Sequence, residues 1–280
     1  MKRLVIIAGA PSHPPGAHEH RAGSLLLQQC LREVAGLHVE VQPNGWVEDD
    51  GVLDDADAIA IYADGGAGHP ILAGDRLDVL GRAVGRGAGL ALIHWAVEVP
   101  VDRGAPAVDR WIGGHYEDGV SCNPIWSAGV ERLPDHPIAR GVGSFATRDE
   151  WYFNLRSGGA ALPNECVVVD GMRMDPILVA TPSDAVREGP YVWPHGPYQD
   201  VVAASGRPET LLWAVERPDG GRGFGLTGGH FHVNWGIDAF RTTVLNALVW
   251  LTGMDVPAAG VASSLSPDDL LRNLDDNRGA

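Results

Sequence analysis

The sequence predicts an α/β fold in which helices cover both faces of a parallel β-sheet. Residues 4–8 and 89–93 are short, uninterrupted apolar runs, which are typical of strands buried on both faces. Up to residue 94, such runs alternate with segments of helical periodicity in the order strand–helix–strand–strand–helix–strand. Short connections in this order favour a parallel sheet with helices on both sides.

The N-terminal third supplies most of these elements. Leu26, Cys30 and Leu31 recur at helical spacing within residues 20–35, and Leu77, Leu80 and Val84 do so within 71–86. We therefore expect helices over these two segments. The strands expected here are 4–8, 37–41, 57–62 and 89–93.

The remainder of the chain adds an irregular stretch and then returns to the sheet. Residues 99–205 are rich in Pro, Gly and Trp, and we interpret them as an insertion with some antiparallel sheet, including strands 166–169 and 177–180. Strands at 210–216 and 223–227 and a helix at 240–251 complete a single domain over 1–255. Residues 256–280 form a polar tail, in which Ser266 either caps a short helix or lies in a mobile segment.

Composition limits the classes of partner. The chain has 280 residues, a formal net charge of −15 and only three cysteines, Cys30, Cys122 and Cys166. The acidic balance argues against nucleic acid or an anionic membrane and favours a small or neutral substrate. Sparse cysteines without a CxxC pattern fit a reducing compartment, and we find neither an 18-residue apolar run nor a signal-peptide core. We expect a cytoplasmic protein.

Histidines gather where the predicted strands end. His94 directly follows the run 89–93, at the position where a strand-to-helix turn can lift one side chain above a sheet. In open parallel sheets, ligands bind beyond the carboxyl ends of the strands. Histidines from remote loops are therefore expected to meet in one crevice, although each alone is equally an inert, hydrogen-bonded side chain. The others near strand ends are His13, His18, His20, His69, His115, His230 and His232.

Two pairs of histidines have a spacing that suits metal binding. His230 and His232 are two residues apart and would point to the same face of a strand, and His18 and His20 have the same spacing. With one more ligand, two imidazoles can hold a divalent ion such as Zn²⁺. The alternative is that one lines the pocket while the other bonds the backbone. The candidate metal ligands are His20, His94, His230 and His232.

Glu150 is the candidate acid–base residue. It precedes Trp151 and Tyr152, and apolar neighbours raise the pKa of a carboxyl group and prepare it for proton transfer. A surface pair with Arg148 is the alternative. Aromatic faces and amides near these motifs suit a sugar, although tryptophans are also ordinary core residues. The candidate substrate-binding residues are His20, His69, Trp95, His115, Asn123, Trp151 and Asn234.

Several catalytic signatures are missing from the sequence. We find no GxGxxG opening a helix and no Walker loop, so no nucleotide cofactor is expected. No GxSxG or cysteine elbow is present, because His94 stands at the elbow position.

The set of motifs resembles the ThuA-like (trehalose utilisation) family of the class I glutamine amidotransferase-like superfamily. It consists of the first strand with its His-rich loop, His94, the run 149–152, and Gly228-Gly229-His230 before the last helix. The resemblance covers residues 1–253 and implies a flavodoxin-like three-layer α/β/α sandwich. It implies that glutamine hydrolysis is absent, because His94 replaces the nucleophilic cysteine. Its site positions match His20 (or His18), His94, Glu150 and His230, whereas the longer loop 12–19, His115 and His232 depart from the family.

Two functions remain open at this stage. The first is an enzyme of bacterial carbohydrate catabolism in which His94, Glu150 and His230 move protons on a disaccharide or keto-sugar derivative, with or without a divalent metal. The second is a non-catalytic sugar-binding or regulatory protein on a degenerate amidotransferase-like fold. Several histidines and an acid sharing one crevice favour the enzyme. In either case the partner is a small carbohydrate, and apolar surface on the insertion is compatible with a homo-oligomer.

Overall fold

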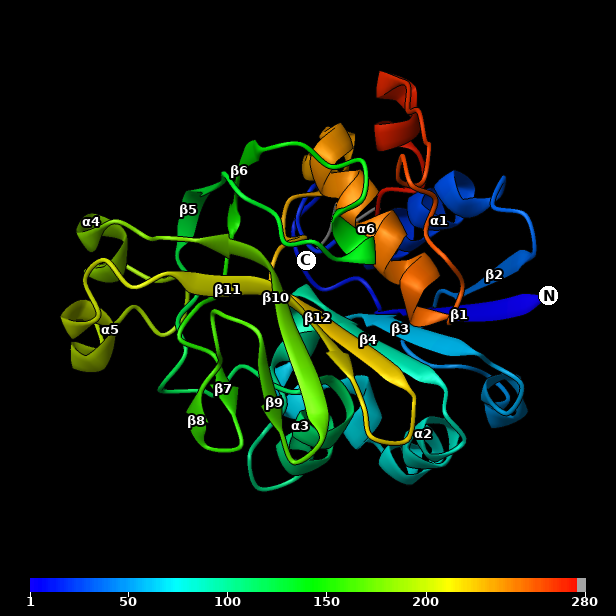
Figure 1. Cartoon of the computed structure of the whole chain (residues 1–280), viewed down its shortest axis with the longest axis horizontal. Helices are drawn as coiled ribbons and strands as arrows, with labels where there is room; N and C mark the ends of the chain where they lie inside the picture. The colour runs from blue at the N-terminus through cyan, green and yellow to red at the C-terminus, as the bar shows by residue number, and fades with distance from the viewer. Residues whose placement is uncertain (276–280) are drawn as a thin grey trace.

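The computed structural model describes residues 1–275 and contains, within them, an eight-stranded mixed sheet (Figure 1). Five neighbouring strands are parallel and the last three are antiparallel. Ala8 pairs with Tyr62, Tyr62 with Ile93, and Ile93 with Leu226, so four parallel strands end at the same level. The sheet order is β2 (Leu37–Gln42), β1 (Lys2–Ala8), β3 (Ala58–Tyr62), β4 (Gly89–Ile93), β12 (Arg222–Leu226), β11 (Glu209–Glu216), β10 (Met172–Ala180) and β9 (Val167–Val169).

Helices cover both faces of the sheet, as the sequence predicts. Helices α1 (His20–Leu31) and α6 (Asp238–Leu251) lie on one face, and α2 (Arg76–Gly85) and α3 (Ala105–Ile112) lie on the other (Figure 1). Alternate residues of one strand enter different cores: Leu4 packs with α1 and α6, whereas Val5 packs with α2 and α3. This two-sided burial explains why the strands are continuous apolar runs.

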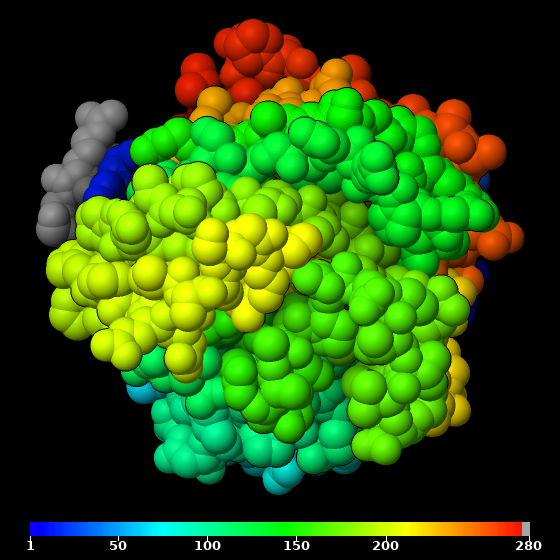
Figure 2. Space-filling view, turned by 60° about the vertical axis from the view of Figure 1, so that its left-hand side comes forward, coloured from blue at the N-terminus to red at the C-terminus, as the bar shows by residue number. Residues whose placement is uncertain are grey.

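The stretch 99–205 contributes both to the main sheet and to small additions. Strands β10 and β9 extend the sheet in antiparallel fashion, and β5 (Ile125–Val130) pairs with β6 (Phe145–Glu150) as a separate ribbon. Figure 2 shows one face of the molecule that is formed mostly by this stretch, coloured green to yellow-green. Its remaining elements are β7 (Arg156–Ser157), β8 (Ala160–Ala161), α4 (Asp184–Arg187), α5 (Gln199–Ala203) and η5 (Pro137–Ala139).

Two sequence predictions about local structure need correction. The helix expected over 71–86 begins only at Arg76, because Pro70 starts a separate 3₁₀ turn, η3 (Pro70–Leu72), and Gly74 adopts φ +58°. The strand geometry assumed for the spacing of His230 and His232 is absent, since His232 begins the 3₁₀ turn η6 (His232–Gly236). Further 3₁₀ turns are η1 (Asp50–Leu53), η2 (Gly66–Gly68) and η4 (His94–Val97).

The tail is partly tied to the domain. Ser266 caps a 3₁₀ turn, η7 (Pro267–Leu271), through a capping box with Asp269. The backbone N–H of Asp275 donates to Glu19 Oε2 at 2.7 Å, next to the start of α1. The rest of the predicted tail, 276–280, lies outside the described residues. Among residues 1–275 no helix has the length and apolarity needed to cross a bilayer.

Candidate functional site

His94 lies at the turn that follows β4, in an unusual backbone conformation. Its φ is +57°, in the left-handed region that disfavours residues with a Cβ atom. Strand β4 ends at Ile93 and η4 begins at His94 itself, so the change of direction falls on this residue. The elbow inferred from the sequence is therefore present, and it places a fully buried imidazole above the carboxyl edge of the sheet.

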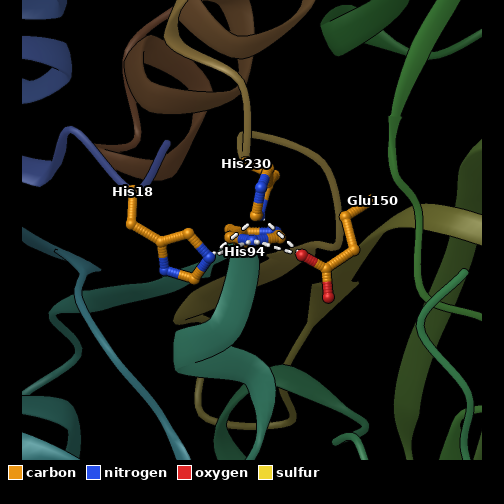
Figure 3. A group of neighbouring side chains, drawn as sticks. All are labelled: His18, His94, Glu150 and His230. Atoms are coloured by element: carbon orange, nitrogen blue, oxygen red, sulfur yellow. Dashed lines mark hydrogen bonds and ion pairs between the residues drawn. The ribbon is translucent and has the colours of Figure 1, made fainter. Parts of the chain in front are cut away.

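Three histidines and one carboxylate converge at this point (Figure 3). His18 Nε2 lies 3.3 Å from His94 Nε2 and 2.9 Å from His230 Nδ1. Glu150 Oε2 lies 2.6 Å from His230 Nδ1 and 3.9 Å from His94 Nε2. His18, His94 and His230 follow β1, β4 and β12, whose ends are aligned, and Glu150 is the last residue of β6 in the separate ribbon. Side chains up to 212 positions apart therefore meet here.

Hydrogen bonds orient two of the imidazoles. His94 Nδ1 lies 2.7 Å from the carbonyl oxygen of Thr227, which can only accept, so Nδ1 carries the proton and Nε2 keeps its lone pair. On the other side, His18 Nδ1 faces Asp64 Oδ1 at 3.4 Å. Burial, followed by the neighbouring histidines, holds the pKa values of His18 and His94 well below the usual range, so both rings are neutral at pH 7.

Glu150 is buried and held in position from two sides. Asn123 Nδ2 donates to its Oε1 at 2.8 Å, while Oε2 faces His230. Burial raises the pKa of this carboxyl group, and the contact with His230 acts in the opposite direction. The alternative surface pair with Arg148 is not formed, because Glu150 is only 3% exposed and points toward the histidines. Asn123 therefore orients the carboxylate.

The arrangement fits a divalent metal ion. Tetrahedral Zn²⁺ binds nitrogen or oxygen at about 2.0–2.2 Å, which separates neighbouring ligand atoms by about 3.3 Å. The four separations given above, 2.6, 2.9, 3.3 and 3.9 Å, bracket that value. Metal-binding histidines also direct the other ring nitrogen to a carbonyl or carboxylate, as His94 does to Thr227 and His18 to Asp64. His18, His94 and His230 are candidate ligands, and the Glu150 carboxylate beside them is either a fourth ligand or a proton-transfer group.

A comparison of the sequence with protein-family models finds a match over most of the chain. The family model described as ThuA, trehalose utilisation, matches residues 12–251. The chain belongs to the ThuA family. No match is found among curated proteins.

A solved structure shares the fold of this chain. A ThuA-like protein from Bacteroides uniformis has a TM-score of 0.61 with 13% sequence identity, over 91% of this chain and 92% of that chain. PurLQS from Thermotoga maritima has a TM-score of 0.40 with 14% identity, over 90% of this chain and 96% of that chain. The fold here is the flavodoxin-like three-layer α/β/α sandwich that the motifs imply.

Some of the histidines that the sequence suggests as site residues lie outside the group of candidate ligands. His18 lies in it, whereas His20 begins α1 and approaches Asp64 at 3.7 Å. His232 lies outside because the chain turns after His230 instead of continuing as a strand. The sequence prediction assumed that the chain continues as a strand after His230, and it therefore chose the wrong second histidine for His230.

Three further candidates make structural contacts. His69 is buried and saturated: its Nδ1 accepts from Ile71 N at 3.2 Å and its Nε2 lies 2.9 Å from Ala96 O. His115 pairs with Asp109 at 2.7 Å. Trp95, by contrast, stands beside the site, with its ring centroid 5.7 Å from that of His18 and its Nε1 donating to Glu98.

The remaining candidates support the walls of the site. Trp151 is completely buried, packed edge-on against Phe240, and presents no exposed face to a ligand. Asn234 Nδ2 donates to Arg148 O at 2.9 Å and so ties η6 to β6. Both residues lie in the packing that positions the ThuA site, and Asn123 contacts Glu150 directly.

Sequence reasoning missed three residues of the site. Asp64 follows β3, Asp149 precedes Glu150, and Tyr152 places its hydroxyl 3.2 Å from His94 Nε2. Asp64 carried a usable signal, because it ends a buried strand at the same sheet edge as His94. For Asp149 and Tyr152, the only signal in the sequence is that they lie next to Glu150 along the chain.

Proposed function

We propose that this ThuA-family protein is a divalent-metal-dependent enzyme of carbohydrate catabolism that acts on a disaccharide or keto-sugar derivative by acid–base chemistry. One observation carries the proposal: His18, His94, Glu150 and His230 point their acceptor atoms to one spot at the carboxyl edge of the sheet. A non-catalytic sugar-binding protein needs aromatic and amide groups but has no use for such a set.

The side chains divide the chemistry among themselves. His18, His94 and His230 would hold the ion, which supplies Lewis-acid polarisation of a substrate oxygen when bound. Glu150 moves the proton, and burial raises its pKa toward the range in which a carboxyl group both accepts and returns a proton. Tyr152 keeps its proton, because burial raises the pKa of its hydroxyl, and it can donate a hydrogen bond at this spot.

Metal analysis tests the first part of the proposal. We expect protein purified without an affinity tag to contain a stoichiometric divalent ion, and His230→Ala and His18→Ala to lose it. His38→Ala is the matched control, since His38 lies exposed on β2. A metal-free protein that is fully active would contradict metal dependence.

Turnover tests the second part. The assay uses oxidised disaccharides as test compounds. We expect Glu150→Gln and His94→Ala to abolish their turnover while unfolding of both variants stays cooperative. Glu33→Gln, at an exposed position, controls for loss of one negative charge. Full activity in both site variants would remove the catalytic assignment.

A further inference from the structure

A cleft of about 420 Å³ opens beside the histidine group. It lies where the strand order reverses: β1 is followed in the chain by β2 on one side, and β3 then pairs with the other side of β1. Ligands of open α/β sheets bind at such switch points, beyond the carboxyl ends of the strands. The volume is within the range of small-molecule sites.

One end of this cleft contacts the candidate metal ligands. Asp64 lines the cleft, and its Oδ1 lies 3.4 Å from His18 Nδ1 and accepts from Ser12 Oγ at 2.9 Å. The carboxylate is 27% exposed, so it can also accept hydrogen bonds from ligand hydroxyls. A sugar ring in the cleft would therefore lie next to the histidine group.

The lining of the cleft also includes an arginine. Arg76 is half-buried, its guanidinium carbon lies 5.1 Å from the centre of the Trp46 ring, and its Nη1 donates to Pro70 O at 3.2 Å. It forms no ion pair with any carboxylate of residues 1–275, although the chain has a net charge of −15. A guanidinium held over an aromatic ring is pre-organised for bidentate binding of a carboxylate or phosphate.

We propose that this cleft is the substrate site, that Asp64 accepts from sugar hydroxyls, and that Arg76 binds an anionic group carried by the sugar. The substrate class is thus an anionic sugar derivative, in which the charge comes from a carboxylate or from a phosphate ester. The inference rests on the proposed function only in calling the bound sugar a substrate. Binding in the cleft itself requires no metal.

Calorimetric titration of metal-free, chelator-treated protein tests the inference. Gluconate, glucose 6-phosphate and glucose are the probes, at low ionic strength, with wild type, Arg76→Gln and Arg82→Gln. Arg82 lies exposed on the same helix and forms no part of the cleft. We expect at least one anionic sugar to bind wild type and Arg82→Gln about tenfold or more tightly than glucose, which is about 1.4 kcal/mol. In Arg76→Gln this preference disappears.

The pattern among probes and variants decides each point. Preference for gluconate alone assigns a carboxylate, and preference for glucose 6-phosphate alone assigns a phosphate. Equal binding of charged and neutral sugars, or an unchanged preference in Arg76→Gln, overturns the inference. If Arg76→Gln fails to fold, Arg76→Lys keeps the charge without the planar fork and should lower the preference.

The two proposals fail separately in this design. The titrations are repeated with His230→Ala, because His230 does not line the cleft. If that variant still prefers anionic sugars, the proposal that the cleft is the substrate site is supported, even if the protein proves to bind no metal. If Arg76→Gln keeps its metal content and its sugar binding is unchanged, the proposal that the cleft is the substrate site is wrong, while the proposal of a metal site stands.

Discussion

Asp149 accepts the backbone N–H of Gly229 at 2.8 Å and thereby joins the end of β6 to the loop that carries His230. The same carboxylate accepts from the N–H groups of Glu150, His230 and Phe231. It is fully buried, and burial raises its pKa while these donors lower it. Asp149 touches none of the candidate ligand atoms, yet it determines where two of them lie.

Replacing this carboxylate should loosen the site. In Asp149→Asn, one acceptor oxygen becomes an NH₂ group that cannot accept from Gly229, which leaves buried donors unpaired at a cost of about 1–3 kcal/mol in unfolding free energy. Metal affinity should fall about tenfold or more, because the loop of His230 is no longer held. Chemical denaturation and metal titration measure both effects. Asp135→Asn, at an exposed position, should change neither. Unaltered metal affinity in Asp149→Asn would show that the loop is positioned by other contacts.

The backbone conformation of His94 predicts a difference between two truncations. His94→Ala and His94→Gly both remove the imidazole, but only glycine adopts φ +57° without a steric penalty. The glycine variant should therefore be more stable than the alanine variant by about 1 kcal/mol, despite its greater entropy when unfolded. Chemical denaturation of the two variants side by side provides the measurement. A more stable alanine variant would contradict the strained elbow.

Strand and helix positions were predictable because burial leaves a local pattern. The run 89–93 is apolar throughout since β4 contacts a core on each face, and this is visible without coordinates. The sequence places the start of α2 too early because the apolar spacing continues through η3, whereas Gly74, between η3 and α2, interrupts the helix. Periodicity records which side chains are buried, whereas the backbone angles of a turn depend on single residues.

The site was predictable only in part, for a related reason. His94, Glu150 and His230 were found because each stands at a strand end or beside aromatic residues. The choice of His18 over His20 depends on the turn before α1, where His18 adopts φ +50°. Asp149 acts by contacts with residues 80 to 82 positions away, and no local pattern records such pairing.

His69 should make stability depend on pH. Burial lowers its pKa to about 4, whereas in the unfolded chain it titrates near its ordinary value of 6.5. Between these values the unfolded state binds the extra proton, so this histidine makes unfolding easier as the pH falls. In His69→Gln the unfolding free energy should decline by about 1.5 kcal/mol less than in wild type between pH 6.5 and pH 5. Denaturant titrations at both pH values measure this. Equal declines in the two proteins would show that the pKa of His69 is the same in the folded and unfolded states.

Gly228 tests how tightly the loop before His230 is packed. A Cβ atom at this position would lie 2.4 Å from the Trp151 ring, which is closer than any van der Waals contact. Gly228→Ala should therefore lower the unfolding free energy by about 1–3 kcal/mol. Gly143→Ala is the matched control, because a Cβ atom there meets nothing within 4 Å and its φ is not positive. Its effect should stay within about 0.5 kcal/mol.

A double-mutant cycle tests whether the stability lost in Gly228→Ala comes from the clash with the Trp151 ring. In a Trp151→Phe background the smaller side chain leaves room for the methyl group, so Gly228→Ala should cost less there than in wild type. Trp151→Phe also loses the hydrogen bond from Nε1 to Thr147 O, but that loss is common to both arms of the cycle and cancels. An equal cost of Gly228→Ala in the two backgrounds would mean that the methyl group clashes with a residue other than Trp151.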